Sequence, residues 1–281
     1  MGYRLRKQLT VIFIILFVLG LIGFIIYWQN YRTLPTCFDK IQNQEEESAD
    51  CGGPCISCER LTIKDVQVEW AKFLLLQENQ YDLIAKIVNP NPNFGLAQIN
   101  YTFKLYNSSG EEIKEQNGSS FILPGEEKYL IEGGMAVQDV PGRVDLVIEK
   151  ADITDWQKFN ADYSLPNIYI LNKEFKPVDN QPGVSQAAGL IRNDSAFDFD
   201  KIIVSIVLFD GSGQIIGVNK TQANTVLAGE QRYFSALWYT PISGQVASVE
   251  MQADTNLLSD ENFISKYGVP EKFQQYPTPT R

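Results

Sequence analysis

The hydrophobic residues of this chain follow two different patterns. Residues 9–28 form one continuous apolar stretch in which fifteen of twenty residues are Leu, Ile, Val or Phe and none is charged. A helix of that length spans about 30 Å, the thickness of the hydrocarbon core of a bilayer. Beyond residue 60, apolar residues come instead in short runs that Gly, Pro, Asn and Asp separate. The first pattern predicts a transmembrane helix, and the second predicts β-strands.

The charges around the apolar stretch predict its orientation. Arg4, Arg6 and Lys7 precede it, and only Arg32 follows closely. By the positive-inside rule, residues 1–8 lie in the cytoplasm and the bulk of the chain is extracytoplasmic. A cleaved signal peptide is the alternative, but it has a shorter apolar core and a small-residue cleavage site, whereas YWQNYRTLP follows here. We therefore expect a single-pass signal-anchor at the cell membrane, with residues 9–28 in contact with lipid.

The β-type pattern predicts an all-β fold. The runs rich in β-branched and aromatic residues predict strands, and the turn-forming clusters between them predict hairpins. Residues 153–163 could instead hold a short linking helix. The expected strands of the first part are residues 66–76, 81–88, 99–106, 119–123, 128–132 and 144–148.

The same signals then return about 103 residues later. The stretch IVNPNPNFGLAQINYTFKLYNSSGEEI (87–113) aligns with LIRNDSAFDFDKIIVSIVLFDGSGQII (190–216), and LPGEEKY (123–129) aligns with LAGEQRY (227–233). A fixed spacing over this length is typical of a tandem duplication. We predict two β-domains at 61–160 and 161–264, after a cysteine-rich linker at 29–60 and before a disordered tail at 265–281.

All four cysteines lie within the linker. Cys37, Cys51, Cys55 and Cys58 are close-set, and outside the cytoplasm such cysteines predict two disulfides. Three pairings remain open. A zinc site of four thiolates and a redox CxxC pair are alternatives.

The linker resembles a known module of bacterial surface and exported proteins. The strings CFDKIQNQE (37–45) and DCGGPC (50–55), with Cys58, are similar to the pattern C-x-D-x-I-x-N-Q-x-E followed by DCGGPC-x-x-C. The chain differs from such modules in the middle, where Glu45-Glu46-Glu47-Ser48 replaces a Gly-rich turn. The resemblance implies an exported, surface-associated protein and no reaction.

The repeated β-region resembles bacterial FxLYD-type domains. FKLYN (103–107) and IVLFD (206–210) are each followed by a Ser-Gly turn and later by a Leu-x-Gly-Glu turn. The first copy has Asn107 in place of the final Asp, and the second has Ile206 and Phe209 in place of Phe and Tyr. The resemblance covers residues 62–263 and implies tandem immunoglobulin-like β-sandwiches. Such sandwiches in exported proteins serve as spacers or interaction modules.

Composition excludes several functions. The chain has no histidine, which removes the commonest general base and metal ligand. All 34 acidic residues follow the apolar stretch, while three of the 24 basic residues precede it, so the part beyond is acidic and unsuited to nucleic acid. We expect no enzyme activity, cofactor or metal. Asp152, Asp155, Asp254 and Asp260, at equivalent ends of the two copies, could bind Ca²⁺ or act as acid and base, but capping of turns and of a short helix is the favoured role.

The expected function is therefore a membrane-anchored extracytoplasmic scaffold or protein-binding module of the bacterial cell envelope, with an envelope protein as its partner. The alternative is a carbohydrate or cell-wall binding protein, in which Trp156, Trp238 and Tyr239 would form the binding surface. An enzyme of unknown type is a minor alternative.

Overall fold

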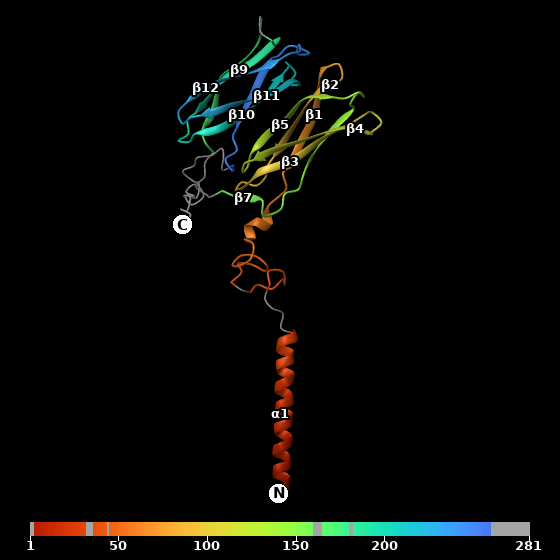
Figure 1. Cartoon of the computed structure of the whole chain (residues 1–281), viewed down its shortest axis with the longest axis vertical. Coiled ribbons are helices and arrows are strands. Elements are labelled where there is room, and N and C mark those ends of the chain that lie inside the picture. The colour runs from red at the N-terminus through yellow and green to blue at the C-terminus, as the bar shows by residue number, and fades with distance from the viewer. Residues whose placement is uncertain (1–2, 32–35, 44, 160–164, 180–181, 260–281) are drawn as a thin grey trace, which may run out of the picture. The chain divides into compact units, whose positions relative to one another are not determined.

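The computed structural model describes residues 3–31, 36–43, 45–159, 165–179 and 182–259 (Figure 1). The chain divides into two units between Thr62 and Ile63. Most described residues after this boundary lie in antiparallel strands, which confirms the predicted all-β class. The predicted tail at 265–281 lies outside the described residues.

The first unit begins with helix α1 (Tyr3–Tyr31). Within the described residues it is the one helix long and apolar enough to cross a membrane, from Gln8 to Trp28. Its side chains between Leu9 and Trp28 are exposed on every side of the helix. A helix that is apolar all round suits lipid rather than water. This is the composition of a membrane anchor or a signal sequence.

The cysteine-rich segment of the first unit contains both predicted disulfides. Cys37 pairs with Cys55, and Cys51 pairs with Cys58. A carboxylate stabilises the turn that follows Cys37: Asp39 accepts hydrogen bonds from the Ile41 amide and the Asn43 side chain. These bonds lower the pKa of Asp39. A short 3₁₀-helix, η1 (Cys58–Thr62), ends the unit.

Two sheets form the first sandwich of the second unit. One has the order β1-β2-β5, and the other has the order β4-β3-β6 with β7 paired to the start of β3. Leu83, Phe103, Leu105 and Ile122 fill the core between them. The bounds are β1 (Gln67–Gln77), β2 (Gln80–Val88), β3 (Phe94–Tyr106), β4 (Glu112–Ile122), β5 (Glu127–Ala136), β6 (Arg143–Ile148) and β7 (Trp156–Lys158).

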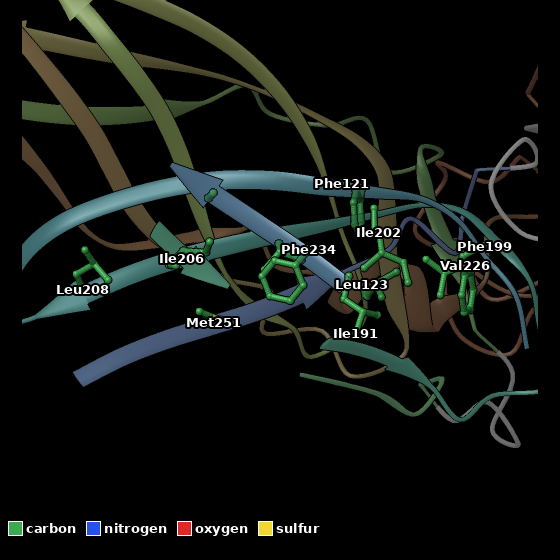
Figure 2. Packing of buried hydrophobic residues seen from close by; sticks show 14 of the residues in the cluster. Phe121, Leu123, Ile191, Phe199, Ile202, Ile206, Leu208, Val226, Phe234 and Met251 are labelled. Carbon is green, nitrogen blue, oxygen red and sulfur yellow. The ribbon is translucent and has the colours of Figure 1, made fainter. Parts of the chain in front are cut away.

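The second sandwich repeats this strand order. Its sheets are β8-β9-β12 and β11-β10-β13, so each strand corresponds to the one seven places earlier. Ile191, Phe199, Ile206 and Phe234 lie in its core (Figure 2). The bounds are β8 (Ile168–Pro177), β9 (Ser185–Asn193), β10 (Phe199–Phe209), β11 (Ile215–Val226), β12 (Gln231–Trp238) and β13 (Ser248–Asp254).

A polar residue at an equivalent position follows the central strand of each sandwich, β3 and β10. Asn107 Oδ1 accepts hydrogen bonds from the amides of Ser109 and Glu111, and Asp210 Oδ1 accepts them from the amides of Ser212 and Gln214. Both Asn and Asp offer this acceptor oxygen, so the exchange between the copies keeps the turn.

The two sandwiches pack face to face along what we call the inter-sandwich interface. The outer face of β1-β2-β5 contributes Ile84 and Ile131, and the outer face of β10-β11-β13 contributes Val207 and Val218. All four are buried, and the partly buried apolar residues around them are Trp70, Leu74, Tyr129, Phe209 and Ile215. The interface therefore joins two different faces of the shared fold.

One predicted element is wrong. Residues 153–155 form a turn and Trp156–Lys158 form strand β7, where a linking helix was expected; residues 160–163 lie outside the described residues. Pairing with Phe94–Leu96 of β3 buries Trp156 and so favours the strand. Strand β4 also begins seven residues before its expected start, because its exposed polar half, Glu112 to Gly118, carries no apolar alternation.

Candidate functional site at the inter-sandwich interface

Clefts open on the inter-sandwich interface. One has a volume of about 500 Å³ and is lined by Ser119, Ser120, Lys201 and Asp254, among others. A smaller one of about 70 Å³ shares Ser119, Ser120 and Asp254 with it and also reaches Lys128. A third, of about 400 Å³, lies against residues of β2, β5, β11 and the end of β12. The first two share lining residues and thus adjoin one another.

A buried cation lines the smaller cleft. Lys128 of β5 is 3% exposed, and its Nζ donates a hydrogen bond to the carbonyl oxygen of Phe121 at 3.2 Å. The same Nζ lies 3.4 Å from the centroid of the Phe121 ring, within the range of a cation–π contact. Its carboxylate neighbours are Glu126 Oε1 at 3.9 Å and Asp254 Oδ2 at 4.0 Å.

Asp254 brings the second sandwich to this cation. It is the last residue of β13 and is 6% exposed. Burial raises its pKa to about 7, because desolvation disfavours the charged carboxylate. The positive charge of Lys128 lowers the pKa of Asp254, whereas the neighbouring Glu126 raises it further. The carboxyl group of Asp254 therefore holds its proton to a higher pH than a solvated aspartate does.

Side-chain hydrogen bonds also cross the interface. Gln252 of β13 donates from Nε2 to the carbonyl oxygen of Glu127 at 2.6 Å and accepts from the amide of Tyr129 at 3.4 Å. It thereby covers main-chain groups at the free edge of β5. Lys220 of β11 donates to Glu132 Oε1 at 3.3 Å, and the Tyr101 hydroxyl donates to the same oxygen at 2.8 Å.

Two of the three aromatic residues predicted to form a binding surface, Trp156 and Trp238, are buried instead. Trp156 is 2% exposed in the first core, and Trp238 is 3% exposed in the second, where its ring meets Phe175 edge-on. Neither side chain can form a surface, because tryptophan at these positions completes the packing of a sandwich. Tyr239 is 68% exposed and lines the 400 Å³ cleft.

The carboxylates at the domain ends have separate roles. Asp155 Oδ2 accepts a hydrogen bond from the amide of Asp152 in an exposed turn, which is turn capping. Asp254 is buried at the interface instead. Asp260 lies outside the described residues.

The cysteines offer one metal-type grouping within the described residues. Cys37, Cys55 and the buried carboxylate of Glu46 lie close enough to share an ion. Both sulfur atoms are in the Cys37–Cys55 disulfide, however, and a disulfide sulfur is not a thiolate ligand. The arrangement therefore has the chemistry of a cross-link.

Sequence reasoning missed Lys128 and Gln252. Lys128 occupies the same place in LPGEEKY as Arg232 occupies in LAGEQRY, where the cation pairs with Glu230 on the surface. One turn motif thus holds an exposed pair in one copy and a buried pair in the other. No local signal distinguishes the two, because the burial of Lys128 depends on the other sandwich.

Among solved structures, the chain has distant likenesses. No family model matches the chain, and no curated protein matches it. A crystal structure of red sea bream transglutaminase is similar to 69% of this chain at 10% identity, with a TM-score of 0.22. The chain spans 29% of the length of that structure.

Proposed function

We propose that this protein is a single-pass membrane-anchored, extracytoplasmic scaffold or protein-binding module of the bacterial envelope. The observation that carries the proposal is the succession of an apolar helix, exposed on all sides, and two disulfides in one unit. Disulfides persist in oxidising compartments, so the chain after the helix belongs outside the cytoplasm. The resemblance of the linker to the DCGGPC module and of the sandwiches to FxLYD-type domains supports the same setting.

The architecture supports a binding role for the sandwiches. Burial of Ile84, Ile131, Val207 and Val218 joins them into one body, so they would present their outer surfaces as a unit. Strands β4 and β6 end one sheet, and β8 and β12 end another. Edge strands offer main-chain donors and acceptors to an extended partner segment. Anchoring would raise the effective concentration of such a partner at the membrane.

Two measurements test the setting and the role. Protease added to intact cells should degrade the chain after the helix, and its cysteines should resist alkylation until a reductant is added. Photo-cross-linking residues placed in cells at Asn117 of β4 and Tyr169 of β8 should each be tested for adducts with envelope proteins, with Ser109 of the β3–β4 turn as a control. Protease resistance, free thiols, or adducts from neither edge would count against the proposal.

A second function has one specific observation in its favour. Tyr239 is exposed beside the 400 Å³ cleft, whose lining includes the amides of Gln77, Gln80 and Asn219. An aromatic ring beside amide groups suits a saccharide, which combines an apolar ring face with hydroxyl groups. Binding to purified cell wall should fall for Tyr239→Ala and stay unchanged for Tyr169→Ala, a control tyrosine on β8. Equal binding by both variants would remove this alternative. That the chain is no enzyme stays a prediction.

A further inference from the structure

The inter-sandwich interface buries an unbalanced set of charges. Glu126 and Lys128 come from the first sandwich and Asp254 comes from the second, and both carboxylates lie within 4.0 Å of the single ammonium. Fully ionised, the group would carry one net negative charge in a site from which water is largely excluded. Such a charge is costly at low dielectric, and uptake of one proton removes it.

The burial of this group depends on the contact between the sandwiches. In the second copy, the equivalent pair Glu230 and Arg232 keeps side-chain exposures of 26% and 42%. Glu149, which has the strand register of Asp254 in the first copy, is also exposed. Separation of the sandwiches would therefore return Asp254 to a solvated environment like that of Glu149.

We propose that the inter-sandwich interface is a pH-sensitive latch, in which Asp254 holds a proton while β13 lies against β5 and releases it when the two sandwiches separate. The latch is closed at mildly acidic pH and loosens in alkaline medium. In an extracytoplasmic protein it would respond to the acidity outside the cell.

The direction of the pH dependence of opening follows from the linkage between protonation of Asp254 and closure of the interface. The closed form holds the proton with a pKa of about 7, whereas a solvated aspartate has a pKa of about 3.8. Between these values the closed form binds more protons than the open form, so closure is favoured at the lower pH and weakens as pH rises. Each unit of separation between the two pKa values changes the opening equilibrium by about tenfold. We expect at least a tenfold increase in opening from pH 5 to pH 8.

Other groups facing Asp254 do not reverse this dependence. Lysines stay protonated from pH 5 to pH 8, and so do tyrosines. Burial raises the pKa of Tyr101 further, and it also raises that of Tyr129. Asp254 is thus the group that takes up the proton. The groups around Asp254 on all packed elements are Glu126, Lys128, Tyr129, Tyr101, Lys201 and Lys220.

Hydrogen exchange of the full-length protein in detergent tests the latch. The amide of Tyr129, which donates to Gln252 across the interface, reports opening after correction for the intrinsic pH dependence of exchange. In the wild type its protection should fall at least tenfold from pH 5 to pH 8. Asp254→Asn, which stays neutral, should remove the fall, and the matched control Asp152→Asn should keep it. Equal pH dependence in wild type and Asp254→Asn would overturn the proposal.

A second measurement follows the titration in the wild-type protein itself. Carboxyl ¹³C chemical shifts of the wild-type protein should show one aspartate titrating near pH 7, and the resonance can be assigned by its loss in Asp254→Asn. If every aspartate carboxyl titrates near pH 4, the proposal is wrong even if the variant fails to fold.

Discussion

Asn89 and Asn193 make the same hydrogen bonds in the two sandwiches. Nδ2 of Asn89 donates to the carbonyl oxygens of Phe94 and Leu123, and Nδ2 of Asn193 donates to those of Phe197 and Leu227. Each asparagine is buried and ties the start of the third strand of its sandwich to the turn before the fifth. This shared bond explains why Asn recurs at the end of the second strand of each copy.

Replacing either asparagine should destabilise its sandwich. Asn89→Ala and Asn193→Ala each remove the hydrogen bonds that a buried amide side chain donates and accepts, so we expect a loss of about 2 to 4 kcal/mol in the free energy of unfolding. Urea unfolding monitored by fluorescence measures this. Asn100→Ala, which removes an exposed bond to Glu149, is the control and should change stability by less than about 0.5 kcal/mol. Similar losses for all three variants would contradict the assigned role.

A charge introduced into the apolar interface should separate the sandwiches. Val218 is buried there, whereas its equivalent in the first copy, Glu115, is exposed. Val218→Glu places an uncompensated carboxylate among Ile84, Ile131 and Val207, and we expect a loss of at least about 3 kcal/mol. Differential scanning calorimetry should show a split or lowered transition. Glu115→Gln should leave the transition unchanged.

Removal of the buried cation should be costly at neutral pH. Lys128→Met keeps much of the aliphatic volume and leaves Glu126 and Asp254 without their cation, so we expect a loss of about 3 to 5 kcal/mol at pH 7.5. The loss should shrink toward pH 5, because protonation of Asp254 removes one of the two negative charges. Chemical unfolding at both pH values measures this. Arg232→Met, at the exposed equivalent, should show little effect at either pH; a pH-independent loss for Lys128→Met would contradict the charge argument.

The two disulfides should contribute unequally to the cysteine-rich segment. The Cys37–Cys55 bridge closes a span of 18 residues and the Cys51–Cys58 bridge a span of 7. Loop-closure entropy predicts stabilisation of about 3 and about 2 kcal/mol respectively. Cys37→Ser with Cys55→Ser should therefore speed proteolysis of residues 36–62 more than Cys51→Ser with Cys58→Ser. Neither change should alter unfolding of the sandwiches, and the reverse order of protease rates would contradict this ranking.

The sequence allowed most of the fold to be predicted, because strand and turn signals are local. Alternation in Phe103 to Tyr106 and the turn after Asn107 identify a hairpin with no knowledge of its surroundings. The candidate site depends on contacts that are far apart in sequence. From the sequence alone, Lys128 is expected at the surface, but in the fold it lies beside Asp254 of the other sandwich. Trp238 is likewise expected at the surface, but the register of its strand places it in the core.

The inter-sandwich interface also limits how far this architecture can extend. Contact between two unlike faces of one repeated fold could in principle continue from chain to chain and build a filament, as head-to-tail contacts do. The outer faces of the other two sheets, β4-β3-β6 and β8-β9-β12, differ in chemistry from those at the interface: Lys104 and Glu115 stand where the second copy has Val207 and Val218, and Ala188 and Ser235 stand where the first has Ile84 and Ile131. Because these faces lack the large apolar side chains that meet at the interface, we expect the contact to form within one chain and not between chains.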